Sequence, residues 1–525
     1  MTDSSKQPTT TGPESTMNEA PAQGPRTPSM FASWMVIVVM IALILTSVAL
    51  FGGDMADGAL QVSMTLATIF ALAVAYYYGH RGSVISNSIH NGVNGAVGTV
   101  FVVIAIGTVI GTLYLSGTVA AFIYYGSDII SPRFFFVTVF LIASALTIML
   151  GSSLTTVGAV GIAFVGLASI ADVSQPITAG AAVSGAVLGN KIAKISDTAN
   201  LAVSTVGGDL TIDVHSKTVT RTAIPTAIIC AVAYLLLGLF GDSGSGSIDV
   251  DQVQSTISQA FNVSLWAFIP VISIFALSML RFSAFLSLTL SAIVAVVIAA
   301  FTQNDLIRSL ADDPDLSYFE AVAEVGIDTF ANGFALNSGV DQLDSLFAGG
   351  GVASMLTTVW LILVAAAFGA VVGSTGMLHR IIAPVIARCS GPTSLVLTTM
   401  LSSIGLNLAT ADPYTSIVLT GNMYRDEYKK QRLKPQLLSA SMADSGTVMS
   451  HIIPWNLHGA IFAGTLGIAT VKWAPWTLFA YVTPVVTFLM VRFYFLHKDR
   501  LPTDADADKA YAVEPAAPTA PQGLA

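Results

Sequence analysis

Long uncharged apolar runs, separated by short polar segments, make up most of this chain. A helix needs about 20 apolar residues to cross the hydrocarbon of a bilayer. Runs of about that length or longer cover residues 33–51, 58–78, 95–125, 134–171, 222–240, 252–280, 282–301, 352–376, 389–411 and 473–491. Two further apolar stretches, 176–215 and 437–469, contain charged residues. The pattern predicts an all-α polytopic membrane protein.

The composition agrees with this interpretation. Of the 525 residues, 54% are apolar and only 10% are charged, and the mean hydropathy is +0.73. A soluble domain carries about 25% charged residues, so a soluble enzyme, a nucleic-acid binder and a disulfide scaffold are excluded. The two cysteines, Cys230 and Cys389, lie in or beside apolar stretches. There is no Gly-Lys dipeptide for a P-loop and no paired metal signature, so we expect neither an enzyme nor a cofactor.

Lysine and arginine gather in only some of the connecting segments. The basic segments are 80–81, 217–221, 281, 380–388, 425–434 and 498–500, whereas 54–58, 126–131, 241–251 and 302–351 are acidic or neutral. The positive-inside rule places the basic segments in the cytoplasm. We therefore expect a multi-pass protein of the cytoplasmic membrane with both termini in the cytoplasm.

Two stretches do not fit simple alternation between the two sides. Residues 392–423 are flanked by basic segments on both sides, and 32 residues are few for two crossings, so a re-entrant hairpin fits better. Residues 134–171 leave and return on the non-basic side in the same way, although they are long enough for two true spans. With both read as hairpins, the prediction is about ten transmembrane helices plus two re-entrant hairpins.

This count contains a repeat. Each half consists of three spans, a hairpin, an interrupted span and a last span, and five crossings per half make the two repeats inverted. Secondary transporters are often built from inverted repeats with broken helices. The alternative is that the few basic residues in each loop impose a symmetry that the fold lacks.

The expected organisation has five parts. They are a disordered cytoplasmic tail at 1–30, a first membrane repeat at 31–240, an external loop at 241–260, a second membrane repeat at 261–500 and a disordered cytoplasmic tail at 501–525. The tails are rich in Ser, Thr, Pro, Gly, Ala or acid and cannot bury a core.

Polar residues interrupt the apolar stretches at matching places in the two halves. The interruptions are at 151–156 and 196–200 in the first half, and at 409–415 and 443–447 in the second, followed by 450–456. Broken backbone at membrane depth persists only where it lines a protein or water cavity. Carboxylate, hydroxyl and carbonyl oxygens at such breaks suit sodium, and the carboxylates can also carry protons.

These clusters supply the candidate site. The predicted cation- and proton-binding residues, which would also be the sodium ligands, are Ser196, Asp197, Thr198, Asn200, Asp412, Asp444, Ser445 and Thr447. Candidates for additional lining are Ser152, Ser153, Thr155, Lys191, His451 and Asn456. We expect Asp197 and Asp444 to face a common cavity.

Each candidate also has a purely structural explanation. Asp197 and Asp444 would be interfacial carboxylates at a loop, and Asp412 would cap a turn before Pro413. The hydroxyls of 152–156 would bond to helix backbone, and His451 would be an ordinary interior residue. Lys191 would either extend to an interface or balance the carboxylates when the site is empty.

Three motifs resemble those of NhaC-type sodium/proton antiporters, within the wider ion-transporter superfamily. The segment G-N-K-I-A-K-I-S-D-T-A-N (189–200) looks like the family's G-D-K-x-S-P-L-S-D-T-T-N, and A-D-P-Y (411–414) begins a segment similar to its A-D-x-Y. The run A-D-S-G-T-V-M-S-H-I-I-P-W-N (443–456) resembles E-D-S-G-T-V-x-S-x-L-I-P-W-N. Asn190, Lys194, Ala199 and Ala443 depart from the family pattern.

The resemblance implies exchange of sodium for protons, and relatives within the family exchange organic acids such as malate and lactate or carry amino acids. Two function hypotheses follow: a sodium/proton antiporter that uses Asp197, Asp412 and Asp444, or a sodium- or proton-coupled exchanger of a small organic acid or amino acid. A passive channel or structural membrane protein is the third and least favoured. Expected partners are sodium ions, protons and the lipid bilayer, with no nucleic acid; a small organic anion and a homo-oligomer stay open.

Overall fold

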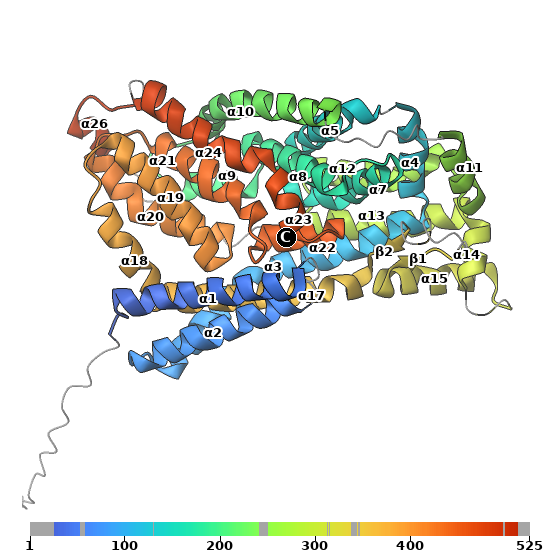
Figure 1. The fold of residues 1–525 in the computed structure, drawn as a ribbon, viewed down its shortest axis with the longest axis horizontal. Coiled ribbons are helices and arrows are strands. Elements are labelled where there is room, and N and C mark those ends of the chain that lie inside the picture. Colours follow the sequence, from blue (N-terminus) through green and yellow to red (C-terminus); the bar gives the residue numbers. More distant parts are fainter. Residues whose placement is uncertain are drawn as a thin grey trace, which may run out of the picture.

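The computed structural model describes residues 26–52, 58–129, 131–240, 250–311, 313, 315–337, 344, 347–496 and 499–512. Its helices in the first half are α1 (Met30–Phe51), α2 (Ala59–Tyr77), α3 (Gly82–Leu115), α4 (Thr118–Ile129), α5 (Phe135–Leu150), α6 (Ser153–Thr156), α7 (Ile162–Ile170), α8 (Gln175–Ile192), α9 (Asp197–Val206) and α10 (Ile212–Phe240). The long helices α1, α3, α10 and α17 run along the long axis of the molecule (Figure 1).

The second half continues with helices and one small sheet. The helices are α11 (Val250–Ala260), α12 (Ile269–Met279), α13 (Ala284–Thr302), α14 (Asn304–Leu310), α15 (Tyr318–Asn332), α17 (Gly351–Ser374), α18 (Met377–Ile386), α19 (Pro392–Thr410), α20 (Pro413–Lys430), α21 (Pro435–Met442), α22 (Leu457–Leu466), α23 (Thr470–Trp473), α24 (Leu478–Met490) and α26 (Asp504–Ala510). Strands β1 (Phe334–Ala335) and β2 (Ala348–Gly349) pair antiparallel, with Phe334 opposite Gly349.

The predicted all-α membrane architecture is confirmed. Ten helices in the described part of the chain are long and apolar enough to cross a membrane. They are a different ten from the predicted crossings, because three of them, Pro132–Leu150, Ser153–Ile170 and Pro392–Thr410, lie in the stretches interpreted as hairpins. The run 252–280 is not one helix: the polar residues of α11 precede a shorter apolar segment, Leu265–Met279.

Both hairpin stretches are interrupted where the sequence predicts it, and in the same manner. In the first, Gly151 closes α5 with a left-handed backbone (φ 71°), and the Ser152 side chain accepts a hydrogen bond from Thr155 N. In the second, Ala411 is left-handed (φ 56°), and Asp412 caps α20 by accepting from Thr415 N at 2.8 Å. A left-handed residue followed by a capping side chain ends one helix and starts the next. The re-entrant course and the inverted repeat stay predictions.

Glycines let neighbouring helices approach closely, both within a half and between the two halves. Helix α3 packs along α17, where a Cβ on Gly107 would collide with the carbonyl oxygen of Gly351. Helix α5 packs along α8, where a Cβ on Gly189 would come within 2.7 Å of the Ser144 carbonyl oxygen. Small residues at such contacts are typical of membrane helix pairs. The second contact fixes the end of α8, which carries Asn190 and Lys191.

The two interrupted spans differ from each other. The first breaks between Ile192 and Asp197, just before the predicted interruption at 196–200, most of which forms the start of α9. In the second, the expected break at 443–447 is wrong: residues Ala443–Thr447 form a π-helical turn that continues α21. The chain leaves the helical path only at Ile453 (φ −91°, ψ 114°). The reason is Pro454, which disfavours helical backbone at the preceding residue, whereas a π turn accommodates Ser445-Gly446 without a break.

The C-terminal segment is ordered farther than expected. Residues 499–512, named here the C-terminal strap, include α26 and run across the ends of α20 and α9. Tyr511 is buried, its hydroxyl donates to the Leu433 carbonyl, and the Asp209 amide donates to the Ala510 carbonyl. Arg432 pairs with Asp504 at 2.9 Å. The expected disordered tail at 501–525 thus contains a helix at its start, and residues 513–525 lie outside the described part, as do 1–25.

The predicted topology can be tested at the two ends of the long axis. Helices α20 and α26 lie at one end and α4, α11 and α14 at the other (Figure 1). We expect single cysteines at Ser131, which precedes α5, and at Lys430, which ends α20, to react with an impermeant maleimide from opposite faces of the membrane. Labelling of intact cells and of inverted vesicles measures this, with a variant lacking Cys230 and Cys389 as the background. Reaction of both positions from one face would refute the topology.

Candidate functional site

The π turn after α21 holds a buried ion pair. Asp444 lies in this turn and is fully buried. The ammonium of Lys191, from the last turn of α8, is 2.8 Å from Asp444 Oδ1, and its side chain is only 2% exposed. A charge in such surroundings is costly unless it is neutralised by a partner. The structure therefore supports the prediction that Lys191 balances a carboxylate, and it contradicts the alternative in which Lys191 extends to an interface.

Two threonines complete the surroundings of the carboxylate. Thr222 Oγ1 on α10 and Thr487 Oγ1 on α24 each lie 2.7 Å from Asp444 Oδ2. Lys191 Nζ also donates to Thr222 Oγ1 at 3.1 Å, and it lies over the Phe479 ring at 5.5 Å. Both carboxylate oxygens are thus engaged by side chains from α8, α10 and α24. Because α10 and α24 pack together, the last helices of the two halves meet at Asp444.

Local backbone geometry explains why Asp444 can lie there. Gly446 packs so tightly against α19 that a Cβ would collide with Ser403 Oγ. Ser445 and Thr447 turn their hydroxyls to their own helix, donating to the carbonyls of Ser441 and Met442. These two predicted cation ligands are buried beside Asp444 in sequence, but their hydroxyls satisfy the local backbone of the π turn.

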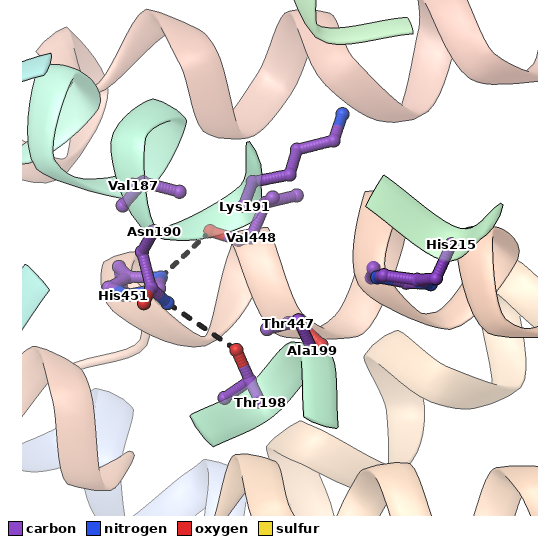
Figure 2. Close-up of a pocket in the computed structure, with 10 residues that line it drawn as sticks. Val187, Asn190, Lys191, Thr198, Ala199, His215, Thr447, Val448 and His451 are labelled. Carbon is purple, nitrogen blue, oxygen red and sulfur yellow. Dashed lines mark hydrogen bonds between the residues drawn. The ribbon is translucent and has the colours of Figure 1, made fainter. Parts of the chain in front are cut away.

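A small cavity lies between the two interrupted spans. It is lined by residues of α8, α9, α10 and the 443–451 segment, namely Val187, Asn190, Lys191, Thr198, Ala199, His215, Ala443, Thr447, Val448 and His451. Figure 2 shows Asn190 pointing to Thr198, with Nδ2 donating to Oγ1 at 3.4 Å, and Lys191 pointing away from the other lining residues. The space open to the centre of a water-sized sphere is about 10 Å³, room for about one water molecule.

The cavity is lined by residues next in sequence to Asp197 and Asp444, but neither carboxylate lines it. Thr198 and Ala199 follow Asp197, and Ala443 precedes Asp444, but the Asp444 side chain is directed to Lys191. The expectation that Asp197 and Asp444 face one common cavity is therefore not met in this conformation. Within the described part of the chain, no three His, Cys, Asp or Glu side chains are grouped as a metal-ion site would require.

The remaining first-half candidates form the start of α9. Ser196 is buried and caps the helix, accepting from Ala199 N at 3.5 Å and lying 3.1 Å from Thr198 Oγ1. Asp197 begins the helix and is exposed. The Asn200 side chain donates to the carbonyls of Lys194 and Ser196. The oxygens of this cluster thus lie at a helix N-terminus beside the cavity, and Asp197 is the one charged group among them.

Asp412 belongs to a separate place in the fold. Its carboxylate accepts hydrogen bonds from Tyr414 N and from Thr415 N and Oγ1, so the capping role is observed. Tyr414 lies within electrostatic range of both Asp412 and Asp197. Among the described contacts, neither acid touches the Lys191–Asp444 pair.

The additional lining candidates divide between the cavity and the helix breaks. Ser152 caps α6 and also accepts from Thr155 Oγ1 at 3.0 Å, and Ser153 is buried in that short helix. His451 lines the cavity and stacks on His458 with ring centroids 4.4 Å apart. Asn456 caps α22 and donates to Asn407 of α19. Of the six, Lys191 and His451 line the cavity.

Sequence reasoning missed Thr222, Thr487, Asn190 and His215 as site residues. Thr222 and Thr487 occur inside apolar helices that contain several other threonines, so no local signal distinguishes them. His215 hydrogen-bonds Ser439 through Nδ1 at 2.9 Å and lines the cavity. Residues three or four positions apart share a face of a helix, so His215, Thr218 or Val219, and Thr222 lie on one face of α10. This spacing is the sequence signal that connects His215 with Thr222.

Comparison with known proteins identifies the family to which the sequence is similar. The sequence model of the Na⁺/H⁺ antiporter family matches residues 1–239 and 195–494. The chain is 29% identical to the Na⁺/H⁺ antiporter NhaC of Alkalihalophilus pseudofirmus over 455 residues, covering 86% of this chain and 93% of that protein.

Two relatives from Bacillus subtilis are similar over nearly the same length. One is named Na⁺/H⁺ antiporter NhaC, with 29% identity over 82% of this chain and 91% of that protein. The other is named malate-2H⁺/Na⁺-lactate antiporter, with 26% identity over 87% of this chain and 93% of that protein. Because the family match extends over most of the chain, this protein belongs to the Na⁺/H⁺ antiporter family.

Proposed function

We propose that this protein is a secondary active transporter that exchanges sodium for protons across the cytoplasmic membrane, with Asp444 as the central carboxylate. The observation that carries the proposal is the fully buried Asp444, paired with Lys191 inside an interrupted span. The family supports the same exchange, since the NhaC relatives are named as Na⁺/H⁺ antiporters.

The chemistry follows from the cost of a buried charge. A carboxylate in low dielectric is stable only when a cation or a proton neutralises it. Asp444 therefore has three stable forms: paired with the Lys191 ammonium, bound to sodium, or protonated. An exchange cycle arises when sodium neutralises Asp444 while the site moves from one side of the membrane to the other. A proton neutralises Asp444 while the site moves back. The Thr222 and Thr487 hydroxyls hold the carboxylate in place throughout.

Asp197 and Asp412, around Tyr414, form the second acidic region of the proposed transport path. We assign them to the route by which ions reach the cavity, with Ser196, Thr198 and Asn200 as oxygen donors along it. Thr198 lines the cavity, and Ser196 lies 3.1 Å from its hydroxyl. In the proposed orientation the basic end of the bundle, which carries α20 and the C-terminal strap, faces the cytoplasm.

An organic anion is the less favoured cargo. The relative named malate-2H⁺/Na⁺-lactate antiporter makes it a hypothesis that must be tested. A cationic side chain would favour a carboxylate substrate, but Lys191 already contacts Asp444 at 2.8 Å. The cavity beside it has room for about one water molecule, which suits a small ion and is too small for a dicarboxylate.

The test is transport by the purified protein in proteoliposomes that contain a pH-sensitive dye. We expect a sodium pulse to move protons without any organic anion, and a choline or potassium pulse to move far fewer. Malate, lactate and arginine are then added singly on either side. Proton movement that requires one of these solutes would refute simple sodium/proton exchange and establish coupled substrate exchange.

A further inference from the structure

The Lys191 ammonium lies near two oxygen atoms and over the Phe479 ring, whose centroid is 5.5 Å away. It is 2.8 Å from Asp444 Oδ1 and 3.1 Å from Thr222 Oγ1, and Thr487 Oγ1 joins the same carboxylate from the other side at 2.7 Å. The two oxygens that contact the ammonium come from the π turn and α10, whereas Thr487 on α24 contacts only the carboxylate. Carboxylate and hydroxyl oxygens are the ligands that a small hard cation prefers. The ammonium therefore occupies a position built for a monovalent cation.

We propose that the Lys191 ammonium marks the sodium-binding position and that Lys191 is a tethered competitor of sodium for Asp444 and Thr222, with Thr487 holding the same carboxylate from the other side. The inference deepens the proposed function and rests on it. It also replaces part of the predicted ligand set, because Ser445 and Thr447 donate to their own helix whereas Thr222 and Thr487 contact the carboxylate.

The hydrogen-bonding capacity of the threonines supports this assignment. A hydroxyl has one proton to donate and two lone pairs that accept. Thr222 Oγ1 lies 2.7 Å from Asp444 Oδ2 and 2.8 Å from the Val219 carbonyl oxygen, so its one proton goes to one of the two. A lone pair faces Lys191 Nζ and is oriented to ligate sodium. Thr487 donates to Oδ2 and has its lone pairs left over.

The competition requires the ammonium to leave when sodium arrives. Lysine carries its charge on a flexible four-carbon stem, and Lys191 is also one of the residues that line the neighbouring cavity. His215 on α10 and His451 are titratable groups that line this cavity together with Lys191. Sodium and the ammonium carry equal charge, so the exchange leaves the net charge around Asp444 unchanged once the ammonium has withdrawn.

The decisive experiment compares variants whose effects on sodium affinity should have opposite signs. Lys191→Gln removes the competitor, so the apparent KM for sodium should fall at alkaline pH, where no proton takes the place of the ammonium on Asp444. Thr222→Val removes a ligand and Thr487→Val removes a hydrogen bond that holds the carboxylate, so KM should rise in both by roughly tenfold, the value of one hydrogen bond to a charged group. A merely structural role for these residues would move KM in the same direction in all three variants.

Matched controls lie one turn away on the same helices. Thr226 and Thr483 are fully buried and donate to the carbonyls of Thr222 and Phe479, so Thr226→Val and Thr483→Val should leave the KM for sodium unchanged. An unchanged or higher KM in folded Lys191→Gln would overturn the competitor role. If that variant does not fold, the comparison of each threonine variant with its matched control still tests the proposal. Equal KM values for Thr222→Val and Thr226→Val would overturn the ligand assignment.

A binding measurement separates this inference from the proposed function. Sodium that binds the folded state raises the Tm of the detergent-solubilised protein, and we expect a larger rise in Lys191→Gln than in the wild type, relative to choline. If the wild type binds sodium but moves no protons, the proposed exchange fails while the ligand assignment stands. If the sodium-dependent rise in Tm is the same in Lys191→Gln and the wild type, the competitor role fails.

Discussion

Replacing Asp444 with Asn should abolish sodium-driven proton movement. The side chain is fully buried, and its carboxylate is the group that pairs with Lys191 and accepts from Thr222 and Thr487. An amide of the same shape keeps some hydrogen bonds, but it neither attracts a cation nor takes up a proton in this pH range. We expect the rate in proteoliposomes to fall to that of empty vesicles.

The single variant also leaves the Lys191 ammonium buried without its counter-charge, which costs about 3–5 kcal/mol of stability. The double variant Asp444→Asn with Lys191→Gln removes both charges, so it should recover much of the lost stability and still not transport. Asp213→Asn is the matched control, since Asp213 pairs with Lys194 at 2.7 Å in an exposed ion pair. Wild-type exchange by a well-folded Asp444→Asn protein would exclude Asp444 as the central carboxylate.

The apparent affinity for sodium should weaken steeply as the pH falls. In the proposed cycle a proton and sodium neutralise the same buried carboxylate, so each must displace the other, and the linkage is reciprocal. Where Asp444 titrates, the apparent KM for sodium should rise by roughly tenfold for each unit of falling pH, the result for one displaced proton. At higher pH, where the free site holds no proton, KM should become independent of pH.

This dependence is measured with initial rates over a series of sodium concentrations and pH values in proteoliposomes. The maximal rate is a useful internal comparison, because competition changes KM and leaves the rate at saturating sodium unaffected. A KM that stays constant from acid to alkaline pH would mean that protons and sodium use different groups. In that case the substrate-exchanger hypothesis would become the better explanation.

The sequence predicts the backbone of the site better than its side-chain contacts. Gly151 and the Asp412-Pro413 pair produce breaks at the predicted positions, because each acts through its own backbone or cap. The break near Asp444 was wrong by about two turns of helix, because a π turn absorbs Ser445-Gly446 and Pro454 decides where the helix ends. Local residue types therefore predict a helix break where a glycine takes the left-handed conformation or a proline ends the helix.

The contacts across the fold could not be predicted in the same way. Asp444 was recognised as a polar residue in an apolar stretch, but its partners Thr222 and Thr487 are 222 and 43 positions away. Their spans contain other buried threonines, among them Thr226 and Thr483, that bond only to their own helix. Which threonine faces the carboxylate depends on the rotation of α10 and α24 about their axes, and that is decided by packing between helices.

The C-terminal strap determines where the chain can be shortened or extended for biochemical work. Ending the chain before residue 499 would remove the hydroxyl of Tyr511 from the Leu433 carbonyl and the Asp504 carboxylate from Arg432, and it would uncover the surface that Ala507 and Ala510 now cover. An affinity tag or fluorescent fusion that replaces the chain after residue 500 would remove the same contacts. Fusions that begin after residue 512 keep every one of these contacts, so the sequence beyond that point is the place for purification handles.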